Sequence, residues 1–175
     1  MAIRDLSRGA RVAIGGLSAS AAVFVALLAH EGYSDRAYPD PTYGTAVPTI
    51  GFGSTGPDVK MGDRTDPVKA AQRALLDVQR FEGAIKRCVT VPLSQAEYDL
   101  YLHMTYNIGE GAFCKSGIVR ELNAGNYRAA CDQILRWRYS NGQDCSVPGN
   151  RTCSGLWKRR QNEHAQCVAA GEAAQ

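Results

Sequence analysis

The chain has 175 residues, of which 45% are hydrophobic and 21% charged, and 20 lysines and arginines against 17 aspartates and glutamates give a net charge of +3. This length suits one domain with a sizeable core and is short for two. The balanced charge excludes the concentrated basic face typical of nucleic-acid-binding proteins, although a mild positive charge would favour approach to an anionic polymer. We therefore expect a globular protein with no nucleic-acid partner. We also expect it to be a monomer.

An uncharged stretch of 18 residues, 12–29, follows three arginines, Arg4, Arg8 and Arg11. As one helix it would be about 27 Å long, slightly short of the ~30 Å hydrocarbon core of a bilayer. Arginines on its N-terminal side predict that this end stays in the cytoplasm while the rest of the chain crosses. Its strongly apolar residues contribute only about −2 to −5 kcal/mol on the insertion scale, so such a helix could insert and later leave the bilayer.

Three interpretations of this segment compete. The small-x-small sequence Ala19-Ser20-Ala21 permits a cleaved signal peptide, but a cut there would leave an apolar region of only about seven residues. A permanent membrane anchor is the second, although alanine, glycine and serine are unusually frequent for one. The third, which we favour, is a signal anchor that is not cleaved and can be released. The predicted organisation is a releasable apolar helix within 1–29, followed by a folded domain over 30–175.

Six cysteines lie in the second half of the chain, and none belongs to a CxxC pair. An even number without metal-ligand spacing favours three disulfides and an oxidising compartment, which agrees with the orientation predicted from the arginines. Six reduced cysteines in a cytosolic protein are the alternative. Six cysteines allow 15 pairings, among which the sequence alone does not decide. Our working assignment pairs Cys88 with Cys114, Cys131 with Cys167 and Cys145 with Cys153.

The folded part begins with short strands and continues with helices. Residues 39–56 alternate strand-forming residues with prolines and glycines, which predicts a small antiparallel sheet or hairpins. Asp66 before Pro67 marks the start of a helix that continues to about Arg87.

Ser94 and Glu97 form a capping box that opens the next helix, which we expect to end near the glycines at 109 and 111. Asn126 is the expected N-cap of a later helix. The remaining helices are predicted over 117–124, 126–138 and 154–169, with a loop over 140–154. The expected fold class is α+β, with a small antiparallel β region followed by a larger helical lobe and preceded by the N-terminal apolar helix.

Three acidic residues, Glu31, Asp35 and Asp40, stand near the front of the folded part. Cleavage of a glycosidic bond needs an acid for the leaving oxygen and usually a second carboxylate across the scissile bond. Glu31 ends the apolar segment, where a low-dielectric environment would raise its pKa and keep it protonated near neutral pH. Asp40 lies beside Pro41, where water would keep it ionised. The two environments suit an acid and a base, although short loops often hold several acids.

Short motifs around these acids resemble the active-site region of phage-type lysozymes, glycoside hydrolase family 24. They are His30-Glu31-Gly32, Tyr38 just ahead of Asp40, and Thr49-Ile50-Gly51-Phe52-Gly53. The family spacing is glutamate, eight residues, aspartate or cysteine, five residues, threonine, and Glu31 and Asp40 fit it. Ala46 occupies the strict threonine position. Thr49 precedes the Ile-Gly-x-Gly turn as the family's threonine does, which predicts a three-residue insertion before it. Ser54 stands where many members have histidine.

The resemblance covers roughly residues 30–168. It continues through Tyr106–Gly111, Cys131–Trp137 and Gly155–Arg160, which are similar to the family's second lobe and to its C-terminal region in lambdoid phages. The N-terminus resembles the signal-anchor-release segment of a subgroup of these endolysins. Members of that subgroup are inactive at the membrane and become active when the segment leaves the bilayer.

The resemblance implies an endolysin that hydrolyses the β-1,4 bonds between N-acetylmuramic acid and N-acetylglucosamine in peptidoglycan and so lyses the host. Glu31 would protonate the leaving oxygen, and Asp40 with Thr49 would act on the attacking water. The family needs no metal or cofactor. The protein would start at the host inner membrane facing the periplasm and then be released into the periplasm. The anchor has no cysteine, so we expect release without thiol exchange.

Other classes of protein remain as alternatives. A non-catalytic, membrane-anchored wall-binding protein on a lysozyme-like scaffold would be expected to lack one carboxylate. A disulfide-bonded interaction protein would give no reason for the spacing of Glu31 and Asp40. A lytic transglycosylase would need no second carboxylate and would leave an anhydro sugar, so its product distinguishes it.

Overall fold

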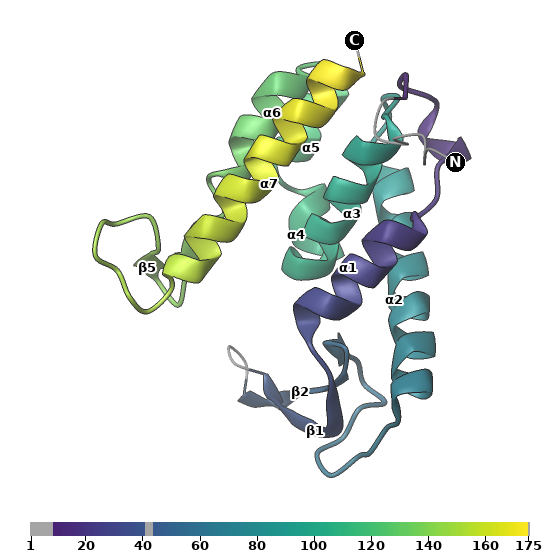
Figure 1. Ribbon diagram of the computed structural model, residues 1–175, viewed down its shortest axis with the longest axis vertical. Coiled ribbons are helices and arrows are strands. Elements are labelled where there is room, and N and C mark those ends of the chain that lie inside the picture. The colour runs from purple at the N-terminus through teal and green to yellow at the C-terminus, as the bar shows by residue number, and fades with distance from the viewer. Residues whose placement is uncertain (1–8, 41–43, 175) are drawn as a thin grey trace, which may run out of the picture. The chain divides into compact units, whose positions relative to one another are not determined.

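The computed structural model describes residues 9–40 and 44–174, which form two compact units. The sheet unit is Ala19–Glu82, and the helical unit joins the residues up to Ser18 to the chain from Gly83 onward. Helix α2 (Pro67–Cys88) passes from the sheet unit into the helical unit (Figure 1). The predicted α+β fold, with a small antiparallel sheet and a larger set of helices, is confirmed.

The sheet unit contains a three-stranded antiparallel sheet in the order β1-β2-β3. Ala37, Ile50 and Val59 are buried together as a small apolar cluster. Successive residues of a strand point to opposite faces and directly paired residues share a face, so the Tyr38–Thr49 pair lies on the face opposite this cluster. The strands are β1 (Ser34–Asp40), β2 (Gly44–Gly51) and β3 (Ser54–Thr55).

The pairing of β1 with β2 is interrupted near the end of β1. Pro39 pairs with Pro48, and the next residue of β1, Asp40, pairs with Gly44. Three residues of β2, those between Gly44 and Pro48, therefore have no partner on β1. Such a bulge bends the strand locally. It includes Ala46 and occurs where the motif spacing predicts a three-residue insertion.

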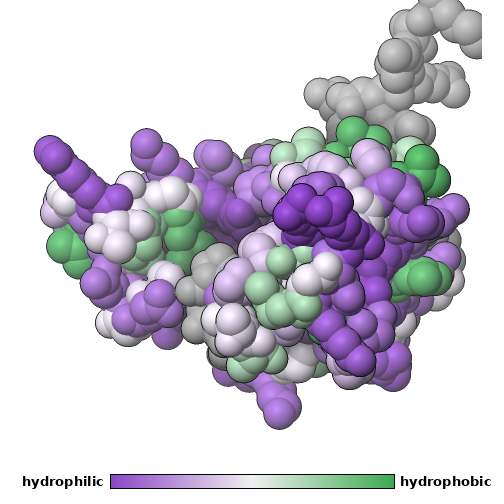
Figure 2. Space-filling view, turned by 90° about the horizontal axis from the view of Figure 1, so that it is seen from below, coloured by the Kyte–Doolittle hydropathy of each residue, from purple (hydrophilic) through white to green (hydrophobic). Residues whose placement is uncertain are grey.

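The predicted continuous helix over residues 12–29 is wrong. The chain makes a short 3₁₀ turn, η1 (Ile14–Gly16), and α1 (Ala21–Glu31) starts only after Ser20, whose hydroxyl accepts a hydrogen bond from the Val23 amide at 3.1 Å. The glycine pair in η1 disfavours a helix, and a serine at the N-cap starts one. In the part of the chain that the structure describes, no helix is both long and apolar enough to cross a bilayer. The face in Figure 2 is largely hydrophilic, with apolar residues in separate patches.

Local start signals predicted where three of the helices begin. Asp66 caps α2 by accepting from the Lys69 amide at 2.9 Å, and the capping box of Ser94 and Glu97 is formed. Asn126 precedes its helix as predicted, but its side chain donates to Glu121 instead of capping. The helix that begins between the two glycines, at Glu110, and a short hairpin at the start of the 140–154 loop were not expected from the sequence. The elements of the helical unit are α3 (Gln95–Ile108), α4 (Glu110–Cys114), α5 (Gly117–Asn123), α6 (Tyr127–Ile134), β4 (Tyr139–Ser140), β5 (Gln143–Asp144) and α7 (Ser154–Ala173).

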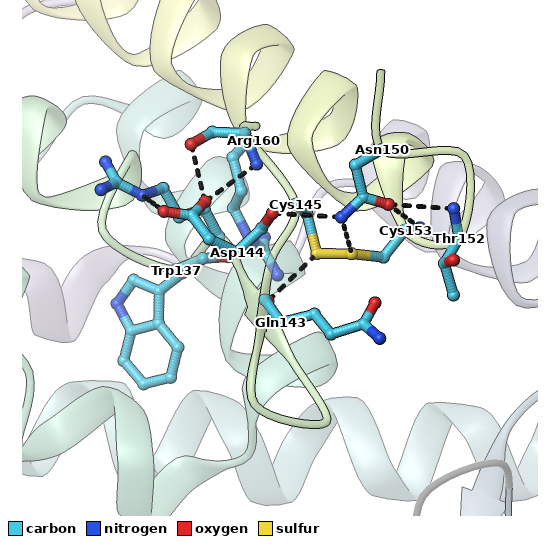
Figure 3. Close-up of a disulfide and its surroundings, with 10 residues drawn as sticks. Trp137, Gln143, Asp144, Cys145, Asn150, Thr152, Cys153 and Arg160 are labelled. Carbon is cyan, nitrogen blue, oxygen red and sulfur yellow. Dashed lines mark hydrogen bonds and ion pairs between the residues drawn. A yellow bond between two sulfur atoms is a disulfide. The ribbon is translucent and has the colours of Figure 1, made fainter. Parts of the chain in front are cut away.

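Three disulfides lie in the helical unit and confirm the working assignment. Figure 3 shows the one that closes the loop between β5 and α7. Asn150 organises this loop, because its amide group donates to the Asp144 carbonyl and accepts from the Thr152 and Cys153 amides, at 2.9–3.1 Å (Figure 3). The pairs are Cys88–Cys114, Cys131–Cys167 and Cys145–Cys153.

Candidate active site

Glu31 is the last residue of α1 and belongs to the sheet unit. Gly32 follows it with φ +70°, a left-handed conformation that ends the helix and turns the chain into β1. The half-buried Glu31 side chain lies directly against Gly53, in the turn between β2 and β3. A Cβ atom at Gly53 would lie 2.9 Å from Glu31 Oε2 and 3.3 Å from its Cγ. A side chain at position 53 would therefore force the carboxyl group to shift from this position.

Thr49 lies on the central strand of the sheet, paired with Tyr38 on one side and with Thr55 on the other. It is 4% exposed, and its Oγ1 atom has no hydrogen-bond partner among the described residues. Ser54 also has a buried hydroxyl without a partner there, but it pairs with Ile50 and so belongs to the opposite face. Of these two hydroxyls, only that of Thr49 shares a face with Tyr38.

Asp40 ends β1 and is half-buried. Its relation to Glu31 is indicated by Tyr38, whose pKa is raised by burial and further by the negative charges of Glu31 and Asp40. Both carboxyl groups thus act on one phenol. Because Tyr38 is also the strand partner of Thr49, the structure brings all three sequence-predicted residues to the surroundings of one side chain.

Two residues near these groups had no role in the sequence analysis beyond the motifs that contain them. The charges of both carboxylates contribute to the raised pKa of Tyr38, and the side chain of Glu31 lies against Gly53. The available signals were a tyrosine just ahead of Asp40 and the second glycine of the Ile-Gly-x-Gly turn. His30, next to Glu31, is exposed.

The chemistry open to this site is acid–base catalysis. Two carboxyl groups and a hydroxyl with an unused hydrogen-bonding capacity suit protonation of a leaving oxygen and activation of water, as glycoside hydrolysis requires. Among the described residues, no group of three histidine, cysteine, aspartate or glutamate side chains is placed to hold a metal ion. A small antiparallel sheet with this site and a separate helical unit define the chain as a lysozyme-like protein.

Comparison with known proteins gives the family. Residues 28–163 match the phage lysozyme family, and the chain belongs to it. The chain is 36% identical over 139 residues to the endolysin of Salmonella phage P22, and this alignment covers 77% of this chain and 87% of the relative. It is 32% identical over 152 residues to the SAR-endolysin of Pseudomonas phage phiKMV, covering 86% and 89%. A crystal structure of a P22 lysozyme mutant matches with a TM-score of 0.67 at 33% identity, covering 87% of this chain and 99% of that one.

Family membership settles the general activity. The protein is a glycoside hydrolase of the lysozyme type that acts on peptidoglycan in phage-mediated lysis.

Proposed function

We propose that Glu31 is the general acid of this lysozyme and that the bond cleaved is the β-1,4 linkage between N-acetylmuramic acid and N-acetylglucosamine. The observation that carries the assignment is the position of the Glu31 carboxyl group, which lies against Gly53 and acts together with Asp40 on the Tyr38 phenol. A pair of carboxyl groups at one site is what hydrolysis of a glycosidic bond uses.

In the proposed reaction, protonated Glu31 gives its proton to the glycosidic oxygen while the bond to the anomeric carbon breaks. Ionised Asp40 accepts a proton from a water molecule, whose oxygen bonds to the anomeric carbon from the opposite face. The products are an inverted free reducing end and a hydroxyl on the leaving sugar. Glu31 is left ionised and Asp40 protonated, and exchange with solvent restores both. The proposal includes no metal or cofactor.

Thr49 is assigned the placement of the attacking water. A hydroxyl both donates and accepts hydrogen bonds, and that of Thr49 is buried with neither capacity used by the described residues. Leaving such a group unpaired costs about 1–3 kcal/mol, which a water or substrate contact would recover. Its strand partner Tyr38 lies in the field of both carboxyl groups, so this face of the sheet is suited to holding the water.

We further propose that residues 1–29 are a releasable membrane anchor and that the described structure is the released form, a monomer in the periplasm. Helix α1 supports this because apolar residues occur on all its sides: Val23 and Leu27 are buried, whereas Val25 is 63% exposed. A helix that is apolar all round is typical of a membrane or a deep core. The name SAR-endolysin of the phiKMV relative also supports it. Since Glu31 ends α1, a helix still in lipid would hold this carboxyl group away from Gly53.

The catalytic assignment is tested with soluble full-length protein, because Val23 and Leu27 are buried parts of the fold. Wild type, Glu31→Gln and the control Asp35→Asn, which changes an exposed carboxylate of β1, are added to purified peptidoglycan. Turbidity and new reducing ends are followed together. We expect the control to match the wild type and Glu31→Gln to be at least about 1000-fold slower, in the range that general acid catalysis supplies.

Each other outcome identifies an alternative. Clearing of the wall by anhydro products without reducing ends would identify a lytic transglycosylase. Binding to the wall without cleavage, by a folded protein with its three disulfides, would identify a wall-binding protein. Full activity of Glu31→Gln would show that another residue is the general acid.

A further inference from the structure

Residues 11–18, which we refer to as the strap, lie on the helical unit. Val12 and Leu93 exchange two backbone hydrogen bonds of 2.9 and 3.0 Å, and the side chain of Gln95 donates to the Ser18 carbonyl at 2.8 Å. Leu17 of the strap is 7% exposed. The strap is therefore docked at both of its ends and partly buried.

Arg11 makes the charged contacts of the strap. Its guanidinium group donates hydrogen bonds to both carboxylate oxygens of Glu97, from Nη2 to Oε1 at 2.7 Å and from Nε to Oε2 at 3.0 Å. It also lies over the ring of Tyr127, 3.6 Å from the ring centre. The two side chains of the ion pair are 19% and 3% exposed. Bidentate charge-assisted hydrogen bonds and stacking on an aromatic face both favour arginine over lysine.

Helix α7 completes this binding place, which we name the Arg11 seat and define as Glu97, Tyr127 and Gly171. A Cβ atom at Gly171 would lie 3.6 Å from Arg11 Nη2 and 3.7 Å from Glu97 Oε1. A cavity of about 50 Å³ adjoins the seat, bounded by α6, α7 and the Arg11 side chain. Three helices, α3, α6 and α7, thus converge on one cation.

Glu97 also stabilises the start of α3, where it is the third residue of the helix and forms a capping box with Ser94. Its Oε2 accepts a hydrogen bond from the Ser94 amide at 2.9 Å. With Arg11 undocked, a carboxylate that is 2% exposed would keep this hydrogen bond but lose its counter-charge. Removing one partner of a buried ion pair is strongly destabilising, because the other charge is left without compensation. The folded helical unit therefore favours a docked Arg11.

We propose that the Arg11 seat is an intramolecular receptor for the strap and that docking of Arg11 keeps residues 12–29 from returning to the membrane after release. The second half rests on the proposed anchor. Val12 cannot pair with Leu93 in the helical unit and begin a membrane-spanning helix at the same time, so docking and insertion exclude each other. A contact made in only one of two states shifts the population toward that state.

Two substitutions weaken the seat while keeping other functions of the same residues. Arg11→Lys retains the positive charge that the predicted membrane orientation needs, but it loses the planar fork and the stacking. Glu97→Gln removes the counter-charge, and glutamine still serves in a capping box. The matched controls are Arg136→Lys and Glu121→Gln, which alter an exposed arginine and a half-buried carboxylate elsewhere on the helical unit.

Docking is measured by hydrogen exchange of the Val12 and Leu93 amides in soluble full-length protein, because these amides form the bridge. We expect both to exchange at least tenfold faster in Arg11→Lys and Glu97→Gln and at the wild-type rate in the controls. If the Val12 and Leu93 amides exchange at the wild-type rate in both seat variants, the Arg11 seat does not hold the strap.

The membrane half is measured by mixing the same soluble proteins with vesicles of phosphatidylethanolamine and phosphatidylglycerol. We expect the seat variants to sediment with vesicles severalfold more than the wild type and the controls. If the amides of the seat variants exchange faster but the variants bind vesicles no more than the wild type, docking of Arg11 does not keep the segment out of the membrane. The Arg11 seat would still be the receptor for the strap. The peptidoglycan assay needs no membrane, so a failure of the catalytic proposal is recognised independently of both results.

Discussion

Two hydroxyl groups of the sheet unit, those of Thr49 and Ser54, are buried without a hydrogen-bond partner among the described residues. Each such group costs about 1–3 kcal/mol in desolvation. They lie on opposite faces of the same small sheet, so they form a natural comparison. A cost to stability is expected where a residue is kept for chemistry, and only Thr49 shares a face with Tyr38.

Replacing Thr49 with valine is expected to separate stability from activity. Valine keeps the branched shape and removes the unpaired hydroxyl, so the free energy of unfolding should stay the same or rise by up to about 1 kcal/mol. Hydrolysis of peptidoglycan should fall about 100-fold, because water is no longer positioned. Urea unfolding and the release of reducing ends measure the two effects. Ser54→Ala, the control, should be stabilised similarly and fully active; an equal loss of activity in both variants would contradict the role of Thr49.

Gly53 offers a second comparison between two glycines with left-handed backbone. Gly53 has φ +75° and Gly62 has φ +97°, but only at Gly53 would a Cβ atom meet the Glu31 carboxyl group; at Gly62 it would meet nothing within 4 Å. Alanine at either position should cost about 1–2 kcal/mol of backbone strain. We expect Gly53→Ala alone to lose activity, by at least about 100-fold, since Glu31 is displaced. If thermal unfolding and turnover show the same changes for both variants, Gly53 has no special relation to Glu31.

At the scale of elements, buried charges join the helices of the helical unit. Arg160 of α7 is 2% exposed and donates to the Trp137 carbonyl at 3.0 Å, and its guanidinium group also binds Asn107 and Glu163. Burial acts to raise the pKa of Glu163, but His103, whose Nδ1 lies 3.7 Å from Oε1, and the hydrogen-bonded Arg160 guanidinium outweigh burial and lower the pKa. Because an unpaired buried charge is so costly, this network fixes α7 against α3 and against the residues that follow α6.

In the sheet unit, an exposed ion pair ties the loop after β3 to α2. Arg73 donates to both carboxylate oxygens of Asp58, at 2.6 and 2.9 Å, and these hydrogen bonds lower the pKa of Asp58 from 3.8 to about 2. Since the folded-state pKa lies below the unfolded value, the contribution of the pair is present above about pH 4 and is lost as the pH falls to about 2.

The expected result is a pH-dependent difference between the wild type and Asp58→Asn. The melting temperature of the wild type should exceed that of Asp58→Asn at pH 5, and the gap should close as the pH approaches 2. Arg73→Gln should remove the same pH dependence, because it removes the hydrogen bonds that lower the pKa. A gap of constant size between pH 5 and pH 2 would show that the Asp58 carboxylate does not contribute through this pair.

The helices could be predicted from sequence to the extent that their signals are local. Asp66 before Pro67, and Ser94 with Glu97, act within one helical turn, and both starts are found where expected. The ends of helices depend on packing beyond the chain neighbourhood. Thus α6 stops at Ile134, before the predicted residue 138, and α7 continues to Ala173, beyond the predicted residue 169.

At the scale of the whole molecule, long-range contacts set the limit of prediction. The apolar run 12–29 favoured one helix, although the glycine pair and Ser20 break it locally. The docking of Arg11 on Glu97, 86 residues away, has no signal near Arg11 in the sequence. The close approach of Gly53 to Glu31 likewise appears only when the turn after β2 is folded. By contrast, the motif spacing predicted a three-residue insertion before Thr49, and three residues of β2 have no partner on β1 in that stretch; the roles of Glu31 and Asp40 stay a prediction.

The two glycines of η1 allow the membrane anchor to be tested at positions outside the sheet unit. Gly15 and Gly16 are exposed, and a Cβ atom at either would meet nothing within 4 Å, so a side chain can be added at both positions. In the bilayer, each added leucine favours insertion by about 0.3–0.6 kcal/mol before the cost of glycine is removed. The double variant should therefore remain with the inner membrane and fail to lyse the host.

The matched control is serine at both positions, which adds side chains at the same open sites without apolar surface. We expect the serine variant to be released and lytic, and the leucine variant to stay in the membrane fraction after cell disruption. Purified in soluble form, the two variants should hydrolyse peptidoglycan equally, because both substitutions lie outside the sheet unit that carries Glu31. If the leucine variant is released and lyses cells as fast as the serine variant, the apolar segment does not control release, and the anchor proposal fails while the catalytic one is untouched.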